Sequence, residues 1–331
     1  MKILIVGLGS IGRRHLLNLK QIAPHTEIGV WRQQSRDPDL GDLAPAVSRV
    51  FFNDQDALTW GAGAALVTNP APLHLGTGLR LAEAGVHLFV EKPLSHTLEQ
   101  AAQLIDLCRQ RALVLMVGYG FRFYPPHQHM KALVEGGRIG RPLFLRAEVG
   151  QYLPDWRPGR DYRTSVSARS ETGGGALLEL SHELDCARWM MGEVASVSAM
   201  VGHLSDLEID VEDYAEISLR FASGAMGNVH LDMVQRPSTR TIRIAGTDGV
   251  ITWDLAGHRV CVFDVMRKEW DEVGTMPSFD FNQVYQDELE HFLSCIEGRA
   301  IPPGPGEAGY RVVEMVLAAK RSSSTRTEVC L

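Results

Sequence analysis

The sequence predicts an α/β protein in which a doubly wound parallel sheet is followed by an α+β domain with a large, mostly antiparallel, open-faced sheet. Up to residue 119, apolar strand-like runs alternate with segments of helical spacing. Residues 194–274 form short alternating runs separated by turns. The length of 331 residues suits two domains of roughly 150 residues each. We place these domains at residues 1–122 and 123–331.

Composition excludes several classes of protein. The net charge is −7 and there is no basic stripe, which argues against nucleic-acid binding. No apolar run approaches the roughly 18 residues of a membrane span. The five cysteines are widely spaced, which predicts neither a disulfide framework nor a metal site. We therefore expect a cytoplasmic protein with no metal and with neither nucleic-acid nor membrane partners.

The first strand leads directly into a glycine-rich loop. "KILIV" at 2–6 is continuously apolar, as in a strand buried on both faces, and "GLGSIG" at 7–12 precedes a helical segment. The three glycines allow a tight turn, close approach of a pyrophosphate and close packing of helix and strand. This context predicts a Rossmann domain, although a glycine-rich turn without a ligand is the alternative. The predicted cofactor-binding residues of the loop are Gly7, Gly9, Ser10, Ile11 and Gly12.

Further strands are predicted at 26–32, 64–69, 86–90 and 113–119, with helices after the second and, from Ser95, after the third of them. Ligands of doubly wound sheets bind beyond the carboxyl ends of the strands. Asn69, Glu91, Lys92 and Tyr119 follow such ends. We include Asn69, Glu91 and Lys92 among the cofactor-binding residues.

The segment "EKP" at 91–93 places two opposite charges next to each other. Pro93 disfavours helical backbone at Lys92, so the chain stays extended there. Adjacent side chains on an extended chain point to opposite sides. We therefore expect Lys92 and Glu91 to face opposite sides, with Glu91 turned to a structural partner or a ribose hydroxyl. The alternative for Lys92 is an ordinary solvated lysine at a strand end.

The second strand decides the expected cofactor. An NAD site usually has an acidic residue about 20 positions beyond the glycine loop. Here Arg32 occupies that place, and no Asp or Glu follows before Asp37. An arginine can pair with a 2′-phosphate, so the sequence favours NADP. NAD, with Arg32 stacked on its adenine, stays open.

The second domain begins with a helix near 127–137 and a strand near 142–153. Residues 151–175 follow without periodicity, and loops of this length are usually functional. The stretch "ALLELSHELDCARWMMG" at 176–192 predicts one helix with Leu180 and Leu184 on its apolar face and Glu179, His182 and Asp185 on the opposite face. A solvated charged face is the alternative interpretation.

The alternating runs at 194–274 predict an antiparallel sheet, and two helices near 282–297 and 307–322 close the chain. Several apolar residues of these runs need cover on more than one face. We therefore expect this sheet to form an oligomer interface. These residues are Val197, Met200, Ile217, Met226 and Val229.

Several motifs together resemble the glucose–fructose oxidoreductase / inositol dehydrogenase / MocA (Gfo/Idh/MocA) family. They are "GLGSIGRRH" at 7–15, "TNPAPLH" at 68–74, "EKP" at 91–93, "GYGFRF" at 118–123, "GGGALLELSHELDCARWMMG" at 173–192 and "DELEHFLSCIEGR" at 287–299. The resemblance covers nearly the whole chain, and it implies a homodimer or homotetramer formed through the second-domain sheet. It implies that Lys92 and His182 lie near the nicotinamide and the reacting carbinol. His74 joins the expected cofactor-binding residues.

The resemblance implies an NAD(P)-dependent oxidoreductase acting on a secondary hydroxyl of a sugar, polyol or sugar nucleotide. His182 is suited to take the hydroxyl proton, and Lys92 to polarise the oxygen. Glu179 or Asp185 can orient the imidazole. Arginines in the long loop favour an acidic or phosphorylated sugar. The expected substrate-binding residues are Arg122, Tyr152, Asp155, Arg157, Tyr162 and Arg163.

Two other functions fit the same motifs. One is a family-type NAD-dependent glycosidase that oxidises its sugar transiently and then returns the hydride. The other is a non-enzymatic sugar or NAD(P) sensor on the same fold, against which the presence of both Lys92 and His182 counts.

Overall fold

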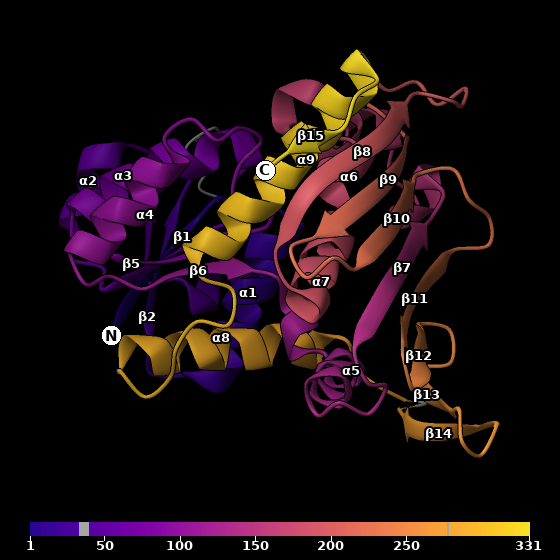
Figure 1. Cartoon of the computed structure of the whole chain (residues 1–331). Coiled ribbons are helices and arrows are strands. Elements are labelled where there is room, and N and C mark those ends of the chain that lie inside the picture. Colours follow the sequence, from indigo (N-terminus) through magenta and orange to yellow (C-terminus); the bar gives the residue numbers. More distant parts are fainter. Residues whose placement is uncertain (33–39, 277) are drawn as a thin grey trace. The chain divides into compact units, whose positions relative to one another are not determined.

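The computed structural model describes residues 1–32, 40–276 and 278–331, which form two compact units (Figure 1). The first unit is Met1–Gly120 with Phe281–Arg311, and the second is Phe121–Asp280 with Val312–Leu331. The domains 1–122 and 123–331 stay a prediction. By packing, residues 281–311 group with the first unit.

The first unit contains a six-stranded sheet of order β3-β2-β1-β4-β5-β6, with every neighbouring pair parallel. Its strands are β1 (Lys2–Val6), β2 (Glu27–Trp31), β3 (Arg49–Phe51), β4 (Ala64–Val67), β5 (His87–Glu91) and β6 (Leu115–Gly118). The apolar runs form strands here because helices cover both faces, so nearly every strand residue is buried. The predicted doubly wound fold is confirmed.

Helices of the first unit come from distant parts of the chain. They are α1 (Ser10–Ile22), α2 (Asp54–Thr59), α3 (His74–Glu83), α4 (Ala101–Gln110) and α8 (Asn282–Ile296). α1 packs against α8 (Figure 1), and the side chains of Asn18 and Asn282 exchange amide hydrogen bonds of 3.3 and 2.9 Å. β3 and α2 were not predicted. The helix expected from Ser95 begins only at Ala101.

The second unit contains a nine-stranded sheet of order β14-β13-β12-β11-β7-β10-β9-β8-β15. β7 and β10 are its one parallel pair among the described residues, and the other pairs are antiparallel, as predicted. Its strands are β7 (Pro142–Gly150), β8 (Val194–Gly202), β9 (Tyr214–Phe221), β10 (Met226–Asp232), β11 (Thr239–Gly246), β12 (Gly249–Asp254), β13 (Arg259–Asp264), β14 (Glu269–Thr275) and β15 (Val329–Cys330).

One face of this sheet carries helices α5 (Pro125–Glu135), α6 (Ala176–Glu179) and α7 (His182–Met191), whereas α9 (Gly306–Thr325) contributes to both units. Alternate residues of each strand therefore differ in exposure. Val197, Ile217 and Val229 are buried within the chain, so the expectation that they need a partner is wrong. Met200 and Met226 lie on the other face, 67% and 42% exposed.

The sequence also led us to expect that the chain has no membrane span, no metal site and no disulfide framework. Of the helices in the described part of the chain, none combines the length and apolarity needed to cross a bilayer. Within the same residues, no group of three or more His, Cys, Asp or Glu side chains is placed to hold a metal ion. All five cysteines are unpaired.

A charged triplet lies on the open face of the nine-stranded sheet. The ring of His230 contacts the Asp232 carboxylate at 3.0 Å through Nε2 and the Glu216 carboxylate at 2.8 Å through Nδ1. Hydrogen bonds to Asp232 and Glu216 raise the pKa of His230 to about 9. The protonated ring thus links β9 to β10, because both of its nitrogens must donate.

We expect His230→Gln to reduce stability in a pH-dependent way. A raised folded-state pKa gives stability that is complete below the unfolded value of about 6.5 and lost as pH rises toward 9. The difference in urea midpoint between wild type and His230→Gln should therefore be largest near pH 6 and shrink by pH 9. Glu216→Gln should weaken this dependence. A difference that stays constant over the range would contradict the assignment.

Candidate active site

In the glycine loop after β1, backbone atoms crowd Gly7 and Gly12, whereas the space beside Gly9 is empty. Gly7 has a φ of +89°, and a Cβ there would lie 2.8 Å from the backbone nitrogen of Asn69. A Cβ on Gly12 would lie 2.3 Å from the carbonyl oxygen of Gly7. Gly9, by contrast, has no atom within 4 Å of such a position and directly precedes α1. The loop therefore fits a pyrophosphate held at the N-terminus of α1.

Glu91, the last residue of β5, points into the first unit. Its carboxylate lies 2.6 Å from Nε2 of His15 on α1 and accepts a 3.1 Å hydrogen bond from the backbone nitrogen of Lys92. Both His15 and Glu91 are buried. Of the two expectations for Glu91, this geometry matches the structural partner. Its role in cofactor binding stays a prediction.

His15 is a residue that sequence reasoning missed. It lies on the apolar stripe of α1 with Gly12, Leu16 and Leu19, and its side chain is fully buried. A histidine at helical spacing among buried apolar residues needs a polar partner. That spacing is the signal by which a buried partner such as Glu91 could have been sought.

Asn69 and His74 connect the end of β4 to the "EKP" turn. The ring of His74 lies 2.7 Å from the carbonyl oxygen of Asn69 and 3.0 Å from that of Pro93. Burial lowers the pKa of His74, so its neutral ring donates to one carbonyl at a time. The Asn69 amide donates to Thr77 at 3.1 Å. These contacts give His74 a structural role, and cofactor binding by either residue stays a prediction.

Lys92 and Arg32 follow strand ends of the same parallel sheet. Lys92 is half-buried and is joined to Pro93 by a cis peptide bond. Arg32 follows β2, and its backbone nitrogen donates to the Phe51 carbonyl at 2.9 Å. Asp37, the first acid beyond it, lies outside the described residues.

His182 is the first residue of α7, because the single helix predicted at 176–192 is two helices separated at Leu180–Ser181. The ring of Phe121 meets that of His182 edge-on, with centroids 5.1 Å apart. Phe121 also stacks on His127 at 4.8 Å and lies 4.3 Å below the guanidinium of Arg240. Phe121 therefore supports the His182 ring, although only its place in "GYGFRF" hints at this.

The carboxylates around His182 do not share one exposed face. Asp185 is fully buried and accepts hydrogen bonds of 2.9 and 2.6 Å from Nε and Nη2 of Arg122. Glu179 accepts a 3.1 Å hydrogen bond from Oγ of Ser167. The expected common face is wrong for two reasons: the break between α6 and α7 takes Glu179 out of register with His182, and Asp185 is buried against Arg122. Catalytic roles for Glu179 and Asp185 stay predictions.

The long loop at 151–175 folds into short 3-10 turns around a cavity of about 120 Å³. Arg157 and Tyr162 line the cavity, whereas Asp155 is exposed outside it. Tyr152 lies under the guanidinium of Arg236, 3.3 Å from its ring centroid. Arg163 pairs with Asp161 and Glu208. The loop thus brings two of the predicted substrate-binding residues to one cavity.

Comparison with known families accounts for both units. The model of the NAD-binding Rossmann fold of the Gfo/Idh/MocA oxidoreductases matches residues 1–119, and that of the family's C-terminal α/β domain matches residues 131–331. The chain belongs to this family. The resemblance noted from the motifs is confirmed.

Individual Gfo/Idh/MocA proteins resemble the chain over most of its length. Myo-inositol 2-dehydrogenase of Thermotoga maritima is 29% identical, covering 100% of this chain and 98% of its own. A 1,5-anhydro-D-fructose reductase of Ensifer adhaerens is 28% identical over 79% of this chain and 78% of its own. The solved structure of levoglucosan dehydrogenase with NADH has a TM-score of 0.88 at 22% identity, covering 100% and 98%, and establishes the shared fold.

We expect Gly9→Ala and Gly7→Ala to separate binding from folding. Gly9→Ala meets no protein atom, so the apoprotein should keep its melting temperature while NAD(P)H affinity falls about tenfold or more. Gly7→Ala should destabilise the fold by about 1–3 kcal/mol, because of its positive φ and the close Asn69 backbone. Calorimetry would measure the first effect and thermal unfolding the second.

Gly76→Ala, on α3, is the matched control because a Cβ there also meets nothing within 4 Å. It should change neither cofactor affinity nor, beyond a small gain in helix propensity, stability. Unaltered cofactor binding by Gly9→Ala would count against a pyrophosphate at the tip of the loop.

Proposed function

We propose that the protein is an NAD(P)-dependent oxidoreductase that transfers a hydride between a nicotinamide cofactor and a secondary hydroxyl of a sugar, polyol or sugar nucleotide. The observation that carries this is a glycine loop whose three glycines leave room for a ligand only at Gly9, in the same unit in which Lys92 directly follows the end of strand β5. The Gfo/Idh/MocA family and its sugar and inositol dehydrogenases support the same class of reaction.

The cofactor supplies the hydride acceptor, and the chain's own residues handle the hydroxyl group. The Lys92 ammonium donates a hydrogen bond to the substrate oxygen and stabilises the negative charge that develops there. His182 accepts the hydroxyl proton as the carbon loses its hydride, which leaves a carbonyl. In the reverse direction, the same imidazole returns the proton.

The two carboxylates proposed to assist His182 differ in their surroundings. Asp185 is held by Arg122, so its role is to fix the first turn of α7 and with it the His182 backbone. Glu179 lies just before the break between the helices and is bound by Ser167. We assign Glu179 as the carboxylate whose loss changes the pH profile, and Asp185 as a positioning residue.

Lys92→Ala and His182→Ala should each reduce kcat by at least about 10²-fold on the true substrate. His182→Ala should leave cofactor affinity unchanged, because the glycine loop belongs to the other unit. The double variant should lose much less than the product of the single losses, as for residues that act as a unit. Steady-state kinetics and calorimetry with NAD(P)H would measure these effects.

His25→Ala, at an exposed histidine outside the proposed site, provides the control and should turn over normally. Near-normal turnover in either single variant would rule out the proposed pairing of roles.

The sugar is best found by screening sugars and sugar nucleotides with both cofactors at the NAD(P)H absorbance. Net redox turnover would support the dehydrogenase, which the relatives favour. Glycoside cleavage without net change of cofactor would indicate the glycosidase instead. Ligand binding with no chemistry would indicate a sensor.

We propose that NADP is preferred over NAD, because Arg32 occupies the place of the usual acid. A guanidinium on the 2′-phosphate contributes a charge-assisted hydrogen bond of about 1.5–3 kcal/mol, or about tenfold or more in affinity. Arg32→Asp should reverse the preference in calorimetric titrations, whereas Arg49→Ala should not. Equal or tighter binding of NAD by the wild type would refute this choice.

We propose a homodimer or homotetramer formed through the open face of the nine-stranded sheet. Met200 and Met226 are exposed there, and Phe144, paired with Met226 across the strands, is 39% exposed. Sedimentation velocity should show an oligomer at micromolar concentration, and Met200→Asp with Met226→Asp should dissociate it. Met266→Asp, in an exposed turn, should have no effect. A wild-type monomer would contradict the proposal.

We also propose a cytoplasmic setting without nucleic-acid or membrane partners, which the five unpaired cysteines and the negative net charge support.

A further inference from the structure

One short stretch of chain builds the cavity in the loop after β7. All of its lining residues lie between positions 153 and 167. Its volume of about 120 Å³ is well below the roughly 300–1,000 Å³ of pockets that enclose whole drug-sized ligands. It is nevertheless large enough for several water molecules. Its size therefore suits one chemical group of a larger ligand or a single small ring.

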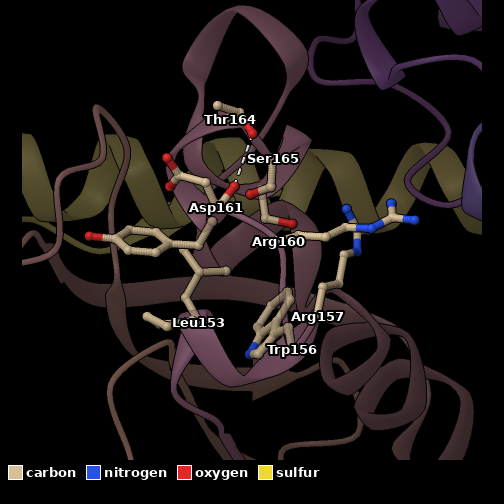
Figure 2. A pocket seen from close by; sticks show the side chains of 10 residues that line it. Leu153, Trp156, Arg157, Arg160, Asp161, Thr164 and Ser165 are labelled. Atoms are coloured by element: carbon tan, nitrogen blue, oxygen red, sulfur yellow. Dashed lines mark hydrogen bonds between the residues drawn. The ribbon is translucent and has the colours of Figure 1, made fainter.

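Two arginines give the cavity a positive charge. Arg157 and Arg160 both line it, and in Figure 2 their side chains extend to the same side of the loop. Within the described part of the chain, neither guanidinium is paired with a carboxylate. This distinguishes both from the nearby Arg163, which pairs with Asp161 and Glu208.

The one carboxylate in the lining, that of Asp161, is already paired with an arginine outside the lining. Asp161 receives hydrogen bonds of 2.9 and 3.1 Å from Nε of Arg163 and one of 2.9 Å from its Nη2. The hydrogen bonds from Arg163 hold the pKa of Asp161 below its ordinary value, so the group stays ionised and bound to that arginine. Arg157 and Arg160 therefore face the cavity without a compensating negative charge.

Hydroxyl and apolar groups complete the lining. Oγ of Ser165 is buried, and among the described residues no hydrogen-bond partner satisfies it. Thr164, by contrast, donates to the Asp161 carbonyl at 2.9 Å, the bond dashed in Figure 2. The indole N–H of Trp156 donates a hydrogen bond of 3.0 Å to the Gln151 carbonyl, which fixes the ring in place. The Trp156 ring and Leu153 form apolar parts of the cavity wall. A ligand oxygen would supply the missing partner of Ser165.

The cavity is connected to the proposed catalytic helices within the same unit. Ser167 lines the cavity, and its Oγ donates to the Glu179 carboxylate at 3.1 Å. Glu179 ends α6, and His182 begins α7 three positions later. A group bound in the cavity is thus one side chain away from the segment that carries the proposed base.

We propose that this cavity binds an anionic oxygen group, a carboxylate or a phosphate, of the sugar-like substrate, with Arg157 and Arg160 as its charge partners. Planar guanidinium groups match both anions by paired hydrogen bonds. The choice of an acidic or phosphorylated sugar over a neutral one follows. This inference rests on the proposed dehydrogenase function for the identity of the ligand, but anion binding itself does not require turnover.

Calorimetric titration of the whole chain with glucuronate, inorganic phosphate and glucose tests the proposal. Glucuronate or phosphate should bind saturably and more weakly as salt is raised, and glucose should bind at least tenfold more weakly. The better of the two anions identifies the kind of group. Arg157→Gln and Arg160→Gln should each weaken its binding at least tenfold, and Arg157→Lys, which keeps the charge but not the fork, should lie between.

Arg141→Gln is the matched control, because it removes the same charge from an exposed position just before β7. It should leave anion affinity unchanged. The proposal is overturned if neither anion binds, or if the Arg157 and Arg160 variants bind as well as Arg141→Gln. Anion binding without dehydrogenase activity would sink the proposed function and leave the cavity assignment standing. Turnover of neutral sugars with no anion binding would support the proposed dehydrogenase function and refute the assignment of the cavity to an anion.

Discussion

A buried contact between His15 and Glu91 directly joins the helix after the glycine loop to the "EKP" turn, the two segments of the first unit on which the proposed chemistry depends. The sheet order places β4 between β1 and β5, so backbone pairing alone does not join the glycine loop to the "EKP" turn. The helix that follows the glycine loop makes this connection through His15. A buried carboxylate must be satisfied, and Glu91 has both the imidazole and the Lys92 backbone as partners.

This constraint explains why adjacent charges at 91 and 92 can have different tasks. Glu91 is committed to the interior, so the backbone at Lys92 is fixed by a hydrogen bond to its neighbour's side chain. His74 contacts the carbonyl oxygen of the next residue, Pro93. With its backbone nitrogen bound to Glu91, Lys92 needs to order mainly its own side chain for the proposed contact with a substrate oxygen, which lowers the entropic cost.

In the second unit, the helix that begins with His182 is held by two buried carboxylate–arginine pairs. The first turn of α7 carries Glu183 and Asp185, which suit the positive end of a helix, and both are buried. Each is paired with an arginine from another element, Glu183 with Arg240 and Asp185 with Arg122. Arg240 also lies over Phe121, which contacts His182.

Much of the fold followed from local pattern, and much of the site did not. Continuous apolar runs predicted most strands of the first sheet, whereas β3 is only three residues long and too short for periodicity. The grouping of residues 281–311 with the first unit depends on which surface their apolar residues find, which spacing does not encode. The break at Leu180–Ser181 and the partners of Asp185 and Glu91 are likewise set by tertiary contacts.

The parallel pairing of β7 with β10 has a consequence for how the long loop after β7 can change among relatives. Gly150 and Asp232 are opposite each other where the two strands end, and beyond them Gln151 and Leu153 donate to the carbonyls of Asp232 and Met233. The first residues of the long loop after β7 are thus hydrogen-bonded to the segment that follows β10. Insertions or substitutions at its root must be matched in the other segment, whereas residues nearer its tip can change alone. Changes to the proposed substrate-binding loop are therefore constrained at its base and less constrained at its tip.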